Sequence, residues 1–440
     1  LKLNMAHEQN NKQDSIHLKV RRLELVNFRC YNQIEISFHD NLTALIGFNG
    51  AGKTALMEGL SGLLQPLAQR LTNQLPPYKI EGFGESDVKN GTAQAINTVW
   101  VALKGQQEEG DVSLNWYATL DSSGYEQEDI SEFDDFNRLD TALRSLRLLY
   151  GERKPVSFPV LAYYPCTYAA MPLGANGMEQ KTAQSGLPDA YDNALNGQNF
   201  DLNAFNDWLV WQINLAEETK DDHLVRAVSD ALLYLLSDEN SRYDALRSTY
   251  KGRRRNGEIM LNKNGQEVRA SQLSSGERTL FGLVGDLARR LVMANPYQET
   301  PLHGSGIVLI DEIDLHLHPS WQRMVIPKLR EIFPNVQFIM TTHSPLVLQG
   351  VQRENIRVLI DGKISEEVPF VYGRDPNSIT EDAFGVALRP HDVEKMVEEI
   401  SRLIDEENEG AAKEKLNELK KLWGDDDREI QRLALHTELM

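Results

Sequence analysis

At roughly 150 residues per domain, a chain of 440 residues has room for about three domains, or for one large α/β domain with an insertion. Its 46 lysines and arginines stand against 65 aspartates and glutamates, and the net charge of −19 excludes a protein that coats nucleic acid through its overall charge. No apolar run approaches the roughly 18 residues of a membrane span, so no membrane partner is expected. The polar N-terminus and the presence of only two cysteines, Cys30 and Cys166, favour a cytoplasmic protein.

The N-terminal part predicts the opening of a nucleotide-binding α/β unit. Residues 1–17 are polar, and we expect them to form a disordered tail. Alternating apolar residues between Leu23 and Phe38 predict two strands in a hairpin. The apolar run 42–46 predicts a third strand, which leads into a glycine-rich loop and then into apolar residues at helical spacing from Leu56 onward.

The sequence from about 70 to 270 is irregular, and we interpret it as an insertion. It contains an acidic stretch at 126–135, a run at 160–164 bounded by prolines, and amphipathic helices at 203–218 and 223–237. No apolar heptad repeat runs through it, which excludes a long coiled coil.

Regular elements return after a tight hairpin that Asn264 and Gly265 predict. Two short apolar runs separated by a helix indicate adjacent parallel strands buried on both faces. The elements expected here are a helix at 276–294, a strand at 307–310, a helix at 319–332, a strand at 336–340, and a strand pair at 356–360 and 367–371. The chain ends in helices with an apolar stripe between Val393 and Ile404.

A phosphate-binding loop is the first motif that carries chemistry. Gly47, Gly52, Lys53 and Thr54 have the spacing that lets backbone N–H groups wrap phosphates while the lysine reaches the β and γ oxygens and the hydroxyl ligates Mg²⁺. The candidate nucleotide contacts in this loop are Asn49, Gly50, Ala51, Gly52, Lys53 and Thr54. A plain glycine-rich turn is the alternative, but the strand before it and the helix after it favour the nucleotide.

Two acidic residues and a histidine follow the next two buried strands. Asp311 can help hold Mg²⁺ together with Thr54, and the adjacent Glu312 can orient or deprotonate a water molecule. His343 ends the neighbouring strand, where an imidazole can sense the γ-phosphate.

A serine-led helix start is the fourth motif. Ser274, Ser275, Gly276 and Glu277 precede an apolar helix, and their hydroxyls and N–H groups form an anion site. Taken alone, this motif equally fits an ordinary helix cap with Glu277 in the first turn.

The order of these four motifs resembles the ABC-type ATPases. The segment 315–319 and the triplet 27–29 further resemble the branch that contains SMC, Rad50 and RecF. The resemblance implies a P-loop ATPase head, with ATP and Mg²⁺ as cofactors, Glu312 as the base, His343 as the switch and Arg29 at the nucleotide. It also implies that Ser274 to Glu277 of one copy close over the ATP of a second copy, in a head-to-tail dimer. The motif here reads Ser-Ser-Gly-Glu rather than Ser-Gly-Gly-Gln, and the Q-loop residue is left open.

The long interval between Thr54 and Ser274 distinguishes members of this superfamily. Residues 190–195, the aromatic residues that follow and the segment 372–379 resemble the PtuA-like ATPases of Septu and retron anti-phage systems. In those systems the partner is an HNH nuclease, so the resemblance implies that this chain controls a PtuB-like nuclease. A Toprim nuclease would require a glutamate and an Asp-x-Asp pair after His343, and we find no such arrangement, so no nuclease site is expected in this chain.

These expectations divide the chain into five segments: the tail 1–17, the N-terminal lobe of the ATPase head 18–70, an α-rich insertion with part of the head 71–269, the C-terminal lobe 270–375, and a helical assembly region 376–440.

Three alternatives stay open. Arg253, Arg254 and Arg255 form a basic cluster that binds nucleic acid or is a solvated turn. His316 and His318 either ligate a metal or belong to the loop after Glu312. At the level of function, a RecF-like or Rad50-like repair ATPase that clamps DNA itself, or a scaffold that holds ATP without turnover, competes with the defence ATPase.

Overall fold

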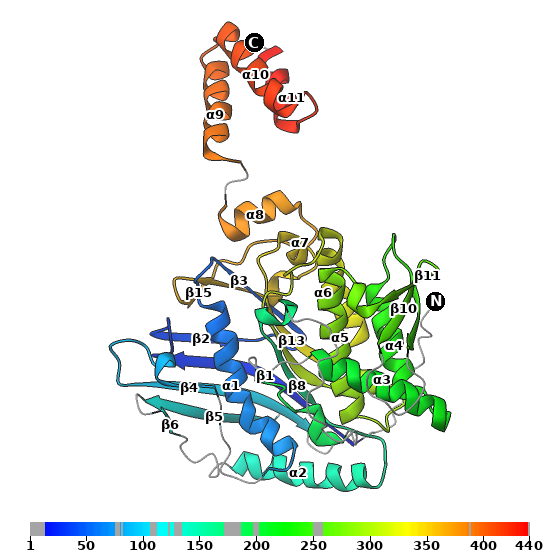
Figure 1. Ribbon diagram of the computed structural model, residues 1–440. Helices are drawn as coiled ribbons and strands as arrows, with labels where there is room; N and C mark the ends of the chain where they lie inside the picture. The colour runs from blue at the N-terminus through cyan, green and yellow to red at the C-terminus, as the bar shows by residue number, and fades with distance from the viewer. Residues whose placement is uncertain are drawn as a thin grey trace. The chain divides into compact units, whose positions relative to one another are not determined.

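A computed structural model describes residues 14–74, 80, 82–105, 112–121, 124–126, 134–170, 186–196, 202–249, 258–386 and 389–438. The chain divides into two units, Leu1–Arg374 and Asp375–Met440. Figure 1 shows the sheets and helices of the first unit and the helices of the second. No helix of the described residues is long and apolar enough to cross a bilayer.

A six-stranded sheet carries the predicted motifs. Its strand order is β15-β14-β3-β13-β12-β8, and every pair is parallel except β14 with β15. The strands are β3 (Leu42–Gly47), β8 (Val160–Tyr164), β12 (Gly306–Ile310), β13 (Val336–Thr341), β14 (Ile356–Ile360) and β15 (Lys363–Ile364). All residues of β3, β8, β12 and β13 are buried, as their nearly uninterrupted apolar runs predict for strands covered on both faces.

A second, antiparallel sheet has the order β2-β1-β4-β5-β6, and β7 pairs with β1. Its strands are β1 (Asp14–Val26), β2 (Gln33–Ser37), β4 (Gln94–Gly105), β5 (Val112–Asp121), β6 (Gly124–Glu126) and β7 (Val156–Ser157). The predicted hairpin of β1 and β2 is present. Strand β1 starts inside the segment expected to be a tail, because Ile16 and Leu18 already pair with β4 and are buried. The interval 71–269 therefore supplies strands to both sheets as well as helices.

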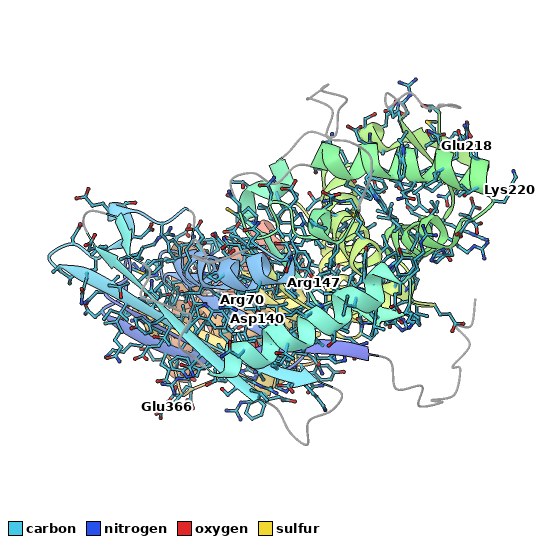
Figure 2. The ribbon with its side chains drawn as sticks, turned by 90° about the horizontal axis from the view of Figure 1, so that it is seen from below. Arg70, Asp140, Arg147, Glu218, Lys220 and Glu366 are labelled. Carbon is cyan, nitrogen blue, oxygen red and sulfur yellow. The ribbon has the colours of Figure 1, made fainter. Side chains whose placement is uncertain are left out.

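Helix α1 (Lys53–Leu71) lies between the two sheets. It contacts β1 and β4 on one side and β3 and β8 on the other, and its residues are buried around most of its circumference. Figure 2 shows its Arg70 facing Asp140 and Arg147 of α2 (Asp134–Gly151). The Arg70 guanidinium donates to Asp140 at 2.6 Å, and Arg147 donates to the Arg70 carbonyl. These two contacts hold the C-terminal end of α1, the helix that begins with the last two residues of the glycine-rich loop.

The remaining predicted elements of the first unit lie close to their expected bounds. They are α3 (Leu202–Thr219), α4 (His223–Leu236), α5 (Ser275–Ala294) and α6 (Pro319–Ile332). The short helix α7 (Pro345–Leu348) was not predicted. A separate three-stranded sheet of β9 (Tyr243–Ser248), β10 (Ile259–Lys263) and β11 (Gln266–Arg269) contains the hairpin that Asn264 and Gly265 predict. Helix α5 is buried from Thr279 to Ala294 and contacts α3, α4 and β8, whereas its first turn is partly exposed.

The prediction of a strand at 367–371 is wrong. The strand that pairs with β14 is β15, because Asp361 and Gly362 have φ values of 48° and 73° and turn the chain back within two residues. Residues 367–371 form no strand, and Phe370 is 64% exposed.

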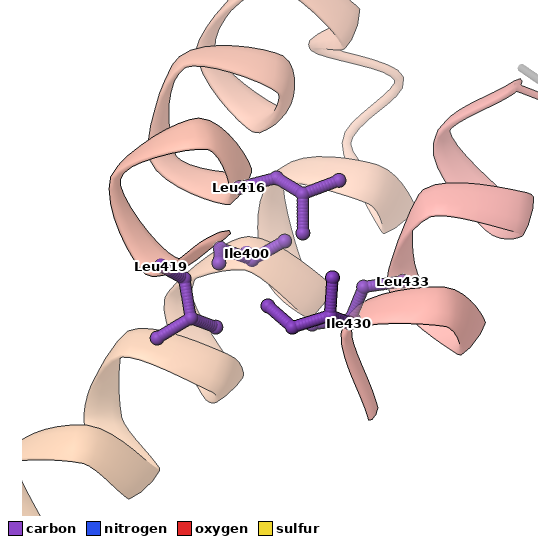
Figure 3. Packing of buried hydrophobic residues seen from close by; sticks show 5 residues of the cluster. All are labelled: Ile400, Leu416, Leu419, Ile430 and Leu433. Carbon is purple, nitrogen blue, oxygen red and sulfur yellow. The ribbon is translucent and has the colours of Figure 1, made fainter. Parts of the chain in front are cut away.

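The C-terminal unit contains α8 (Pro376–Phe384), α9 (His391–Asp405), α10 (Glu409–Trp423) and α11 (Arg428–Glu438). Its helices α9, α10 and α11 share a small apolar core, drawn in Figure 3, of Ile400, Leu416, Leu419, Ile430 and Leu433. The apolar stripe of α9 thus has partners within its own unit.

Candidate nucleotide site

The glycine loop of residues 47–54 connects β3 to α1 and has a backbone that only glycine adopts readily. Gly50 and Gly52 have φ values of 80° and 100°. A Cβ added to Gly52 would lie 2.4 Å from the hydroxyl oxygen of Tyr31, which donates a hydrogen bond of 2.8 Å to the Gly52 carbonyl. Asn49 and Gly50 are exposed at the tip, so the loop presents its backbone to solvent.

Lys53 lies inside this loop. Its Nζ donates to the carbonyl oxygens of Gly47 at 2.9 Å and Phe48 at 3.1 Å, and the residue is 6% exposed. Burial lowers the pKa of Lys53, while the negative charges of Asp311, Glu312 and Asp314 oppose that shift. The ammonium group therefore faces the acidic end of β12 with limited hydration.

The structure brings the two halves of the predicted magnesium site together. The Thr54 hydroxyl donates to Asp311 Oδ2 at 2.8 Å, and Asp311 is 1% exposed. The other oxygen, Oδ1, accepts a hydrogen bond of 2.6 Å from the Thr341 hydroxyl, which in turn accepts from the Glu312 N–H at 2.7 Å. Thr341 ends β13, the strand between β3 and β12, so one hydroxyl orients both acidic residues.

His343 lies two residues further along the chain from Thr341. The backbone N–H of His343 donates to Asp314 Oδ1 at 3.3 Å, and the same oxygen accepts from the Thr342 hydroxyl at 2.6 Å. Burial and then the charge of Lys53 lower the pKa of His343, although Asp314, Glu312 and Asp311 favour protonation. The imidazole is therefore neutral near pH 7. Sequence reasoning missed Thr341 and Asp314, although hydroxyl residues directly after a buried strand were a usable signal.

Arg29 lies beside the first turns of α1. Its Nε donates to Asp87 at 2.6 Å, and its NH1 group pairs with Glu58, which lies one turn after Thr54. Burial opposes the charge of Arg29, but the two carboxylates raise its pKa overall. A nucleotide-binding role for Arg29 stays a prediction.

Ser274 caps α5 in the geometry of a capping box. Its Oγ accepts from the Glu277 N–H at 3.3 Å and donates to Glu277 Oε2 at 2.7 Å, and its own N–H donates to Oε2 at 2.9 Å. Glu277 Oε1 accepts from the Tyr243 hydroxyl at 2.7 Å and from Lys263 at 2.8 Å. Within the described part of the chain, the carboxylate of Glu277 thus accepts four hydrogen bonds inside its own head, whereas the resemblance to ABC-type ATPases implied a contact with the nucleotide.

Gly276 allows a close approach of the loop after Glu312. A Cβ at Gly276 would lie 2.7 Å from the carbonyl oxygen of His316, whose φ is 62°. The adjacent Ser275 opens α5. The helix tip and the 315–319 loop are therefore packed together within one copy.

Two family models match the chain. An AAA ATPase domain matches residues 18–133, and an AAA domain described for the AbiEii toxin of type IV toxin–antitoxin systems matches residues 186–349. The "Retron Vc95 probable ATPase" of Vibrio cholerae serotype O1 biovar El Tor is 30% identical over 393 residues, which cover 78% of this chain and 73% of that protein. The chain belongs to the retron ATPase family.

Other relatives also align with most of this chain. The "Retron Ec83 probable ATPase" of Escherichia coli is 29% identical over 96% of this chain and 87% of the relative. The Septu protein PtuA of Bacillus thuringiensis is 23% identical over 89% of this chain and 91% of the relative. Among solved structures, the SMC head domain from Pyrococcus furiosus aligns with 79% of this chain at 16% identity and a TM-score of 0.47.

The residues of this site fit a magnesium nucleotide. A hydroxyl and a carboxylate, the oxygen donors that Mg²⁺ prefers, already lie 2.8 Å apart at Thr54 and Asp311. The side chains of Tyr31 and Cys30 lie too close to Gly52 to leave room for a Cβ there, so the loop requires glycine at this position.

The alternatives for the basic cluster and the histidines have different outcomes. Arg253, Arg254 and Arg255 lie outside the described residues. His318 caps α6, where its side chain accepts from the Ser320 N–H. Among the described residues, no group of three or more His, Cys, Asp and Glu side chains is arranged to hold a metal ion.

Proposed function

We propose that this chain is the ATP-binding and ATP-hydrolysing subunit of an anti-phage defence complex, and that nucleotide-dependent pairing of two heads controls a partner HNH nuclease of the PtuB type. The observation that carries the proposal is the continuous set of hydrogen bonds from Thr54 through Asp311 and Thr341 to Glu312. It joins the phosphate loop to the acidic residue that would activate water.

Each residue of the site has a distinct task in this proposal. Lys53 and the loop N–H groups bind the triphosphate, and Thr54 and Asp311 hold Mg²⁺, which neutralises charge on the phosphate oxygens. Glu312 accepts the proton of the attacking water, since Thr341 fixes its backbone position. His343, neutral near pH 7, donates or accepts a hydrogen bond at the γ-phosphate.

The dimer is the means of control. Ser274, with the N–H groups of Ser275 and Gly276, presents an anion site at the start of α5, and a second copy would use it to close over the bound ATP. ATP binding would favour the paired heads, and hydrolysis would separate them.

The nuclease is proposed to lie in another chain. The relatives named after retrons and Septu align with most of this sequence. Asp361 lies in the turn between β14 and β15, and the described residues after Pro376 are largely helical, which supports a chain without a Toprim site of its own.

Two substitutions test the proposal. Lys53→Ala should abolish ATP binding, because it removes the buried charge of the phosphate loop. Glu312→Gln should bind ATP normally but hydrolyse it roughly 10²- to 10⁴-fold more slowly, since the base is lost. Phosphate release and equilibrium binding measure the two effects.

A third arm tests the partner. In a reconstituted complex with either variant, the activity of the HNH nuclease should no longer depend on ATP. Arg247→Met, at an exposed position on β9, should behave as the wild type. Undiminished turnover in both Lys53→Ala and Glu312→Gln would refute the ATPase proposal, and nuclease activity that ignores ATP would refute the control.

A further inference from the structure

The acidic residue in the serine-led helix tip presents an electrostatic problem. The tip is proposed to receive a triphosphate, yet Glu277 places a carboxylate one helical turn from Ser274 and bonds to it directly. A bare carboxylate at that position repels phosphate, and the repulsion is strong in a partly dehydrated interface.

The structure compensates this charge from a different element. Lys263, at the end of β10, donates to Glu277 Oε1 at 2.8 Å, and the side chain of Glu277 is 11% exposed. Tyr243, at the start of β9, donates to the same oxygen at 2.7 Å and is itself 3% exposed. Lys263 also lies over the Tyr243 ring, 5.3 Å from its centre.

The two carboxylate oxygens of Glu277 thus have different hydrogen-bond partners. Oε1 is bonded to the three-stranded sheet, and Oε2 is bonded to the N–H and hydroxyl of Ser274. Burial alone would raise the pKa of Glu277, but Lys263, Tyr243 and Ser274 together lower it to about 2. The carboxylate is therefore ionised at every physiological pH, and its charge has to be balanced by a neighbour.

We propose that Lys263 and Tyr243 are positioning residues for the trans-acting serine: Lys263 neutralises Glu277, and both side chains hold its carboxylate so that Ser274 can meet the triphosphate of a second copy. This inference rests on the proposed function. It assigns the β9–β11 sheet to the ATP-dependent pairing of heads, and it takes Glu277 out of the set of nucleotide contacts.

The test uses the full chain in a Glu312→Gln background, where slow hydrolysis preserves the ATP-bound state. Lys263→Met keeps the length and apolar stem of the side chain but removes its charge. We expect the dimer with Mg·ATP to form ~10- to 100-fold more weakly, because a charged hydrogen bond to a carboxylate is lost. ATP affinity of the monomer, measured with a fluorescent ATP analogue at low protein concentration, should be unchanged.

A rescue variant separates charge compensation from mere support of the fold. Lys263→Met combined with Glu277→Gln should restore the dimer to near the level of the background protein, since the amide needs no counter-charge. The matched control is Arg247→Met, which removes an exposed ion pair with Glu267 on the same sheet and should leave dimerisation unchanged.

The outcomes are distinct. A background protein that shows no ATP-dependent dimer overturns the proposed function and this inference together. If the background protein dimerises and Lys263→Met dimerises equally well, only this inference is overturned. The same holds if the double variant does not regain dimerisation although its melting temperature matches that of Lys263→Met.

Discussion

A single hydroxyl connects the two acidic residues of the nucleotide site. Thr341 donates to Asp311 and accepts from the Glu312 N–H, and it is fully buried at the end of β13. Groups that orient a metal ligand from outside its coordination sphere typically contribute 10- to 100-fold to metal affinity or activity, as a rough guide. We therefore regard Thr341 as a positioning residue for both Mg²⁺ and the attacking water.

Replacing Thr341 by valine tests this assignment. Thr341→Val keeps the shape but leaves the Glu312 N–H and one Asp311 oxygen without their partner, so ATP turnover should fall about 10- to 100-fold and the Mg²⁺ concentration for half-maximal rate should rise. A magnesium titration of phosphate release measures both.

The control for this substitution lies on the neighbouring strand. Thr43→Val removes a buried hydroxyl from β3 that accepts a hydrogen bond of 2.9 Å from the His39 N–H, at a distance from the acidic pair. It should lower stability without changing the magnesium requirement. An unaltered magnesium requirement in Thr341→Val would show that the hydroxyl does not orient the acidic pair.

Much of the nucleotide site can be predicted from sequence, because Lys53, Thr54 and Asp311 follow buried strands in motifs with fixed spacing. The positioning residues are different. Lys263 and Tyr243 contact Glu277 only because a separate sheet folds against the start of α5. Their partners are set by tertiary packing, on which spacing within the sequence carries no information.

Helix α5 is fixed to the rest of the head through a buried ion cluster. Asp286, 1% exposed, pairs with Arg289 and Arg290 at 2.7 Å, and Tyr164 at the end of β8 donates to it at 3.0 Å. The carbonyl of Tyr164 accepts from the Asp311 N–H at 2.8 Å. The helix that Ser274 caps is therefore connected through two hydrogen bonds to the backbone of Asp311, the proposed magnesium ligand.

The buried cluster predicts a pH-dependent stability. Burial raises the pKa of Asp286, but Arg290 and Arg289 outweigh it and lower the pKa to about 2. A carboxyl whose pKa is lowered by folding stabilises the protein above its unfolded pKa of about 4, and this contribution is lost as the pH falls toward 2. Asp286→Asn should cost about 3–5 kcal/mol at pH 7, because two buried arginines lose their counter-charge.

Urea unfolding at pH 7, 5 and 3 measures this effect. The difference between the wild type and Asp286→Asn should be constant from pH 7 to 5 and smaller at pH 3. Asp222→Asn, which breaks the exposed pair with Arg226 on α4, should leave the stability nearly unchanged at every pH. A difference that does not change with pH would contradict an ionised Asp286.

Elements with a strong local pattern are predictable from the sequence, and elements that depend on their pairing partners are not. The strands β3, β12 and β13 and the helices α5 and α6 are continuous apolar runs or clear amphipathic segments. Strands β4 and β5 were missed, because they lie in an irregular stretch, where β4 takes its register from β1 and β5 takes its register from β4. The short β15 was predicted at the wrong place, at 367–371. The tight turn at Asp361 and Gly362 makes the residues directly after it pair with β14 instead.

The whole molecule consists of a nucleotide-binding unit and a C-terminal unit with its own core. The two units divide at Arg374, and Ile400, Leu416 and Ile430 form part of the core of the second unit. Because α9, α10 and α11 bury these residues among themselves, the first unit does not need them to complete its sheets.

Truncation after Arg374 tests this independence. The shortened chain should bind ATP with unchanged affinity and show the same thermal stabilisation by Mg·ATP, while its mass by light scattering should indicate a smaller oligomer if the terminal helices assemble the complex. An unchanged oligomer would remove the assembly role, and loss of ATP binding would contradict the independence of the first unit.

The contact between Gly276 and the His316 carbonyl has a consequence for any pair of heads. The loop after Glu312 belongs to a chain's own site, whereas the adjacent helix tip would serve the site of its companion. Because the two backbones approach too closely to admit even a Cβ at Gly276, a rearrangement at one ATP would be transmitted to the other. The two ATP sites of such a pair would therefore hydrolyse ATP alternately or simultaneously, but not independently of each other.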